Sequence, residues 1–177
     1  MTETQKKLCG GLIQYPTGHG TRRDISKEEF LREFPTSLGA EGRLSLNLLK
    51  DAYQSQDADE VSCALVIGWT FGFGPEHKDI LLRLADEDWH YSQEDVVDAL
   101  DMFRTPDMVP ALFRATQWIP KALEYDDARA MAVKAIWSLG RIPGTESEEK
   151  LMTLAQSDNA ILRKNALEQL ELRHSKS

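Results

Sequence analysis

The residues that could carry out chemistry are few, and they are scattered along the chain. Four histidines lie far apart, and no H-E-x-x-H or C-x-x-C spacing places two metal ligands on one element: His19, His77, His90 and His174. Asp86 and Asp88 lie near His90, but acidic side chains in a turn are more often solvated than bound to a metal ion. The sequence therefore predicts no metal site and no cofactor.

The two cysteines and the glycine pairs give no catalytic pattern either. The combination of Cys9 with His19 is too ambiguous to define a nucleophile and its base, and no feature of the sequence indicates a lowered pKa for the Cys9 thiol. The glycines of the first 20 residues do not lie between a strand and a helix, as a phosphate-binding loop would. We expect reduced, structural thiols, no catalytic residues and no enzymatic activity.

A stripe of acidic residues is more informative. At about 100° per residue, Glu94, Asp98 and Asp101 fall on one side of a helix expected over residues 92–103, with apolar residues opposite. Like charges at this spacing disfavour a helix slightly, and no Lys or Arg of the same helix lies among them. The stripe is either a solvated face or a surface for a partner.

Acidic turns between the expected helices form a second pattern. They lie near residues 56–60, 86–91 and 124–127, and two of them contain aromatic side chains. Acidic residues that precede a helix often cap its N-terminus, which accounts for Asp57, Asp126 and Asp158. Capping does not account for the others, which we predict to bind a partner: Asp86, Glu87, Asp88, Trp89, Tyr91, Tyr125 and Asp127.

Composition limits the class of partner. The chain has 177 residues, 41% of them hydrophobic and 28% charged, which is typical of a soluble globular protein. A net charge of -8 argues against nucleic acid, whose phosphates require Lys and Arg, and favours a basic protein. No apolar run approaches the roughly 20 residues of a membrane span, and no apolar signal core follows the polar start. We expect a cytoplasmic protein that does not bind membranes.

The pattern divides the chain into an irregular N-terminal arm, residues 1–24, and an all-α domain, residues 25–177. Glycines and Pro16 interrupt the arm, whereas helical periodicity begins at Ser26. Several residues are predicted to begin or end helices in the domain: Ser26, Asp57, Ser92, Thr105 with Pro106, Asp158, a capping box from Thr145 to Glu148, and Gly140 as a C-terminal cap.

An alanine followed by a larger apolar residue recurs in the second helix of each expected pair. The four alanines are separated by 35, 36 and 31 residues: Ala64, Ala99, Ala135 and Ala166. A period in the thirties with two helices per unit is typical of an α-solenoid, in which the small residue allows neighbouring helices to approach closely. Trp69, Trp118 and Trp137 have apolar helical spacing and are predicted to lie in the core.

Residues 132–172 resemble a tandem HEAT-like repeat. The resemblance rests on Leu139-Gly140, Pro143, the L-x-x-L of residues 151–154, Asp158, and the R-x-x-A-L-x-x-L of residues 163–170. It fades toward Leu44 and does not include the first 40 residues. It implies a right-handed α–α superhelix of about four helix pairs with a protein-binding surface, and a structural role for Arg163. Some bacterial proteins of this kind accompany enzymes, and others are immunity proteins against toxins.

These observations favour a protein-binding α-solenoid. The most concrete hypothesis is an immunity protein that neutralises a basic toxin by covering it with an acidic surface. One alternative is a HEAT-like adaptor or regulatory subunit of a larger complex. Another is a solenoid enzyme such as a chromophore lyase. The sequence leaves the partner's identity and the oligomeric state open.

Overall fold

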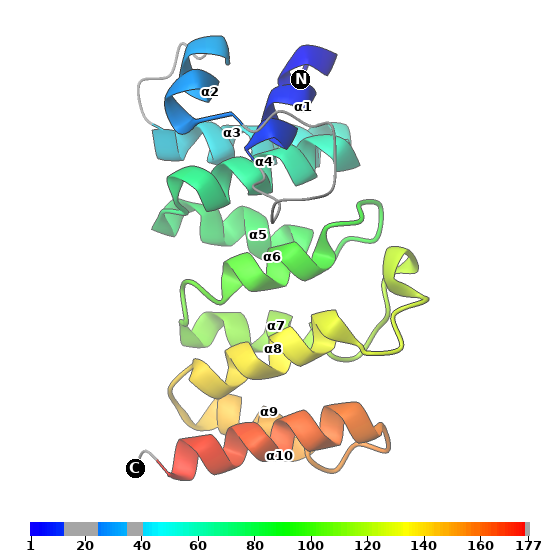
Figure 1. Ribbon diagram of the computed structural model, residues 1–177. Helices are drawn as coiled ribbons and strands as arrows, with labels where there is room; N and C mark the ends of the chain where they lie inside the picture. The colour runs from blue at the N-terminus through cyan, green and yellow to red at the C-terminus, as the bar shows by residue number, and fades with distance from the viewer. Residues whose placement is uncertain (13–24, 35–40, 176–177) are drawn as a thin grey trace. The chain divides into compact units, whose positions relative to one another are not determined.

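The computed structural model describes residues 1–12, 25–34 and 41–175, and all regular elements in these ranges are helices (Figure 1). The predicted all-α class is confirmed. The chain divides into two compact units, Met1–Ile80 and Leu81–Ser177, whereas sequence analysis placed a boundary after residue 24. A continuous superhelix over the chain stays a prediction.

The first unit is built on the pair α3 (Glu41–Ser55) and α4 (Ala58–Phe71), followed by the 3-10 helix η1 (Pro75–His77). α1 (Glu3–Gly11) packs on α4 and also contacts α2 (Lys27–Glu33). Two predicted caps are confirmed, since Ser26 Oγ accepts from the Glu29 N–H and Asp57 Oδ1 accepts from the Glu60 N–H. These bonds fix where α2 and α4 begin.

The prediction of an irregular arm is wrong over its first half. Residues 3–11 form α1, which begins with a capping box between Thr2 and Gln5. The helix ends at a pair of buried glycines, and these glycines mask its periodicity in the sequence. Lys6 Nζ lies 3.1 Å from Asp57 Oδ2, and the α-amino group of Met1 forms an ion pair with Glu60, so charged contacts link α1 to α4. Residues 13–24 of the predicted arm lie outside the described ranges.

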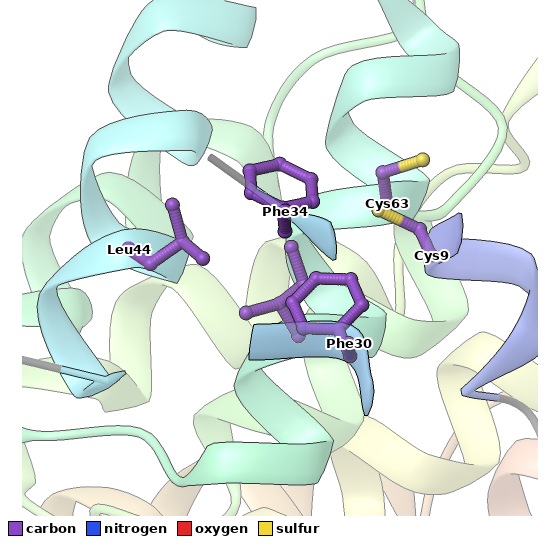
Figure 2. Close-up of a cluster of buried hydrophobic side chains, with 6 residues drawn as sticks. Cys9, Phe30, Phe34, Leu44 and Cys63 are labelled. Atoms are coloured by element: carbon purple, nitrogen blue, oxygen red, sulfur yellow. The ribbon is translucent and has the colours of Figure 1, made fainter. Parts of the chain in front are cut away.

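A cluster of buried side chains joins α1 and α2 to the α3–α4 pair (Figure 2). The rings of Phe30 and Phe34 stack with centroids 4.9 Å apart, and Leu44 packs against them. Cys9 and Cys63 lie side by side in the same cluster as free thiols (Figure 2). A hydrogen bond to Cys63, together with burial, raises the pKa of Cys9 well above its ordinary value. The environment is that of structural thiols.

The second unit contains α6 (Gln93–Leu100), α7 (Val109–Ala115), α8 (Ala130–Arg141), α9 (Thr145–Leu154) and α10 (Ala160–His174). α5 (Lys78–Leu84) spans the boundary between the units, and the 3-10 helices η2 (Pro106–Met108) and η3 (Lys121–Leu123) lie in the connections. α8 packs against α6, α7, α9 and α10, so the second helices of three pairs lie in one layer, one beside the next (Figure 1). Stacked helix pairs have this packing pattern.

The recurring alanines occupy the positions that the repeat pattern predicts. Ala64, Ala99, Ala135 and Ala166 are all completely buried. The larger residue that follows is buried in the first three cases, as Leu65, Leu100 and Ile136. The fourth, Leu167, is 47% exposed, so the pattern is complete in three pairs and not in the last.

Several predicted helix ends are corrected. The capping box from Thr145 to Glu148 does not form, because α9 begins at Thr145 after Gly144, and Ser147 Oγ instead donates to the carbonyls of Leu139 and Ile142. Asn159, not Asp158, caps α10 through its side-chain oxygen. Gly140 lies within the last turn of α8 and does not cap it.

Of the remaining predicted ends, the two starts are correct in position, whereas the end of α6 is not. Ser92 precedes α6 but makes no side-chain capping bond, and α6 itself ends at Leu100, before the predicted residue 103. Thr105 is followed by Pro106 at the first position of η2, as predicted. Arg163 has the structural role that the resemblance implied, since Nη1 donates to the carbonyl of Ser157 at 2.6 Å.

The prediction that three tryptophans lie in the core is wrong for two of them. Trp69 is 46% exposed and Trp137 is 42% exposed, whereas Trp118 is partly buried. Both exposed rings lie at the border between the apolar and polar sides of a helix, where apolar spacing alone cannot separate core from surface. Trp137 also has a polar partner, because its Nε1 donates to Asn165 Oδ1 at 3.0 Å.

Candidate partner-binding surface

The turn between α5 and α6 is held from inside by His90. Its Nε2 donates to the carbonyl of Leu84 at 2.9 Å, and its Nδ1 accepts from the Ser92 N–H at 3.1 Å. Burial lowers the pKa of His90, which keeps the ring neutral, as this pair of bonds requires. The buried Gln93 adds two bonds, from Nε2 to the carbonyls of Glu87 and His90. Both ring nitrogens of His90 are used, so neither remains for a metal ion.

This buried framework holds the predicted binding residues of the turn in two different environments. Asp86 forms a paired interaction with Arg114 of α7, at 3.0 and 2.6 Å, and Trp89 Nε1 donates to Glu87 at 3.0 Å. Asp88 and Tyr91 are exposed, Tyr91 to 51%. Asp86, Glu87 and Trp89 stabilise the turn, while Asp88 and Tyr91 are its exposed acidic and aromatic side chains.

The connection between α7 and α8 presents the second predicted group. Asp126 accepts from the N–H groups of Ala128 and Ala130 at 3.1 and 2.6 Å, but the N-cap position of α8 is Arg129, so Asp126 bonds the first helical N–H without being the N-cap residue that sequence analysis predicted. Tyr125 is 95% exposed, and Asp127 is also exposed. A tyrosine ring almost entirely in water contributes nothing to the core, so folding does not account for its exposure.

Both connections project from the same side of the second unit, at the right in Figure 1. We call the four exposed side chains Asp88, Tyr91, Tyr125 and Asp127 the acidic edge. It combines carboxylates, which attract basic groups over a distance, with tyrosine rings that gain free energy when they are buried in an interface. The turn at residues 56–60 belongs to the other unit, and its place in a longer ridge stays a prediction.

The structure also brings together the predicted acidic stripe, but it neutralises much of its charge. Lys134 Nζ of α8 lies 2.7 Å from Glu94 Oε1 and also pairs with Asp98. Asp101 accepts from Ser138 Oγ and from Arg141 Nη1, each at 2.8 Å. The stripe is therefore largely an internal contact between α6 and α8 and presents much less free charge than the sequence predicted.

Lys134 and Arg141 are the residues that sequence reasoning missed at the stripe. Compensating charges are absent from α6 itself: Lys134 and Arg141 come from the next helix pair, and Arg104, which follows α6, also contacts Asp101 at 3.4 Å. A signal for them is present in the sequence, because Asp98 precedes Ala99 as Lys134 precedes Ala135, which gives them the same position in adjacent repeats. Residues at equivalent positions of stacked repeats are neighbours, so opposite charges there predict a pair.

Comparison of the chain with protein-family models, with curated proteins and with solved structures finds no match. Across residues 1–12, 25–34 and 41–175, no helix is both long and apolar enough to cross a membrane. In the same part of the chain, no three His, Cys, Asp or Glu side chains gather as a metal site would require.

Proposed function

We propose that this protein binds another protein through the acidic edge, and that it is an immunity protein which neutralises a basic toxin. The observation that carries the proposal is the exposure of Tyr125 and Tyr91 among carboxylates, on connections that side-chain hydrogen bonds hold in place. Aromatic side chains on a rigid support lose little conformational entropy on binding, which makes them effective interface anchors. The surrounding carboxylates would accelerate association with a basic partner.

The paired environment of the acidic stripe supports the edge as the more important surface. Glu94, Asp98 and Asp101 would have to give up contacts with α8 before they could bind a partner. Such exchange costs free energy, whereas Asp88 and Asp127 are exposed and would lose mainly water. The stripe residues remain part of the proposed surface, with a smaller share of the binding energy.

The proposal is tested by affinity capture from the native host, with tagged wild-type protein and an edge variant in parallel. The edge variant carries Asp88→Lys, Tyr125→Ala and Asp127→Lys. We expect the wild type to retain one dominant basic protein that is toxic when expressed alone and harmless when co-expressed. We expect the edge variant to lose this protein, because two attractive charges become repulsive and one anchor is removed.

A control variant makes the comparison specific. Glu146→Lys, Glu149→Lys and Met152→Ala change the same number of charges and one exposed large side chain on α9, away from the edge. This variant should retain the partner. Capture of the subunits of a larger complex would favour the adaptor instead, and equal capture by the edge and control variants would overturn the proposed surface.

A further inference from the structure

A second surface lies between α8 and α10, away from the acidic edge. It is a hollow of about 640 Å³ in the second unit, and we call it the Trp137 groove. Its main lining side chains are Arg104, Trp137, Arg141, Glu168, Leu172 and Arg173. The groove is chemically unlike the rest of the surface, because three of its four charged side chains are arginines in a chain of net charge -8.

The floor of the groove depends on Gly140. A Cβ at this position would lie 2.2 Å from Gln169 Oε1, so a larger residue would require the Gln169 side chain to move from its place across α8. Beside it, Trp137 is held by its bond to Asn165 but remains 42% exposed, and Leu172 is 49% exposed. Trp137 and Leu172 thus form an exposed apolar patch in the groove.

The three arginines differ in how many of their N–H donors are already used in hydrogen bonds within the protein. Arg173 is fixed by carbonyls at the end of α8 and contributes mainly positive potential. Arg141 and Arg104 both contact Asp101, at 2.8 and 3.4 Å, and their side chains are 46% and 55% exposed. A guanidinium has five N–H donors, and these contacts leave several of them on Arg104 and Arg141 for an incoming carboxylate.

We propose that the Trp137 groove docks an acidic segment of a partner protein that carries one large apolar side chain. That side chain would cover Trp137 and Leu172, and flanking carboxylates would pair with Arg104 and Arg141. Charge favours this occupant, since three arginines line the groove against one acidic residue, Glu168, and an incoming carboxylate would share Arg104 and Arg141 with Asp101. The negative net charge of the molecule disfavours single-stranded nucleic acid, which would bring a phosphate at every nucleotide.

The test is a selection of a displayed library of random peptides on the full chain. We expect the enriched peptides to contain Asp or Glu on both sides of a Trp, Phe or Leu. A synthetic peptide of the enriched sequence should bind about tenfold more weakly to Trp137→Ala and to Arg141→Gln. Trp69→Ala removes a ring of similar exposure from the other unit and should leave affinity unchanged.

Three results would overturn the proposal. The first is a selection that yields no binder or yields basic or uncharged peptides. The second is an acidic peptide that loses no affinity on the two groove variants, both of which must retain the wild-type circular dichroism spectrum. The third is a labelled oligothymidylate that binds the groove when the acidic peptide does not. The edge variant should bind the peptide normally, so failure here is distinguishable from failure of the proposed function.

Discussion

Replacement of Arg173 by alanine should destabilise the second unit far more than any other change of a partly exposed charge on α10. The Arg173 side chain is 17% exposed and crosses from α10 to the end of α8. Its Nη1 contacts the carbonyl of Ile142 at 2.7 Å and Ser147 Oγ at 2.8 Å, and Nη2 contacts the carbonyl of Gly144 at 3.0 Å. These acceptors lie at the end of α8, in the connection that follows it and within α9, so one side chain of α10 joins both helices.

The magnitude follows from these contacts. Nη1 carries two hydrogens, so its four acceptors, which include two carbonyls at 3.3 Å, share about two full hydrogen bonds. The bond to Gly144 is solvent-exposed and counts for less. Hydrogen bonds from a charged donor contribute about 1.5 kcal/mol or more each, so we expect a loss of about 3 kcal/mol in the free energy of unfolding.

Urea denaturation followed by far-ultraviolet circular dichroism measures this loss. With a slope of about 2 kcal/mol/M, the midpoint should fall by about 1.5 M. Lys164→Ala is the matched control, since Lys164 is on the same helix, is 75% exposed and reaches Glu168 only at 3.9 Å. It should cost less than about 0.5 kcal/mol. Equal stability of the two variants would refute the reasoning that Arg173 joins α10 to α8.

Three further predictions concern buried and capping groups. Burial lowers the pKa of His90, so the unfolded state binds its proton more readily, and stability falls as the pH drops below the ordinary value of about 6.5. The free energy of unfolding should therefore fall less between about pH 7.5 and 5.5 in His90→Gln than in the wild type, as chemical denaturation at each pH would show. Cys9 and Cys63 should resist a thiol reagent in the native protein and react only after denaturation, and rapid reaction in the folded state would contradict their buried placement. Asn159→Ala should lower the free energy of unfolding by about 1 kcal/mol, because the Asn159 side-chain oxygen accepts from N–H groups in the first turn of α10. Asp158→Ala should lower it much less, and thermal or urea unfolding of both variants measures the difference.

Periodicity was sufficient to place the helix pairs and their buried alanines, but not to decide whether Trp69 and Trp137 are buried. The recurring alanines predicted both the helix pairs and their contact positions, because a small residue that returns at a fixed period marks the points where neighbouring helices approach each other. Periodicity failed where a local signal contradicted the pattern. The glycine pair at the end of α1 is typical of irregular chain, and the capping signal that Thr2 and Gln5 carry was overlooked.

The candidate site was predictable in its composition and only partly in its geometry. The exposed tyrosines and carboxylates of the two connections could be identified because helix capping did not account for them. The neutralisation of the acidic stripe could not be seen within α6, since Lys134 is 36 residues from Asp98 and requires the repeat register. The Trp137 groove was missed because Trp137 was assigned to the core, and exposure at the border of a helix face depends on the neighbouring helix.

The central claim is that the acidic edge binds a basic protein, and calorimetric titration with the captured partner tests it most directly. We expect the edge variant to bind about a hundredfold more weakly than the wild type and the α9 control variant to bind equally well. We also expect the wild-type affinity to fall between about 50 and 300 mM salt, and to fall less in the edge variant. An edge variant that binds within about threefold of the wild type at both salt concentrations would contradict the account.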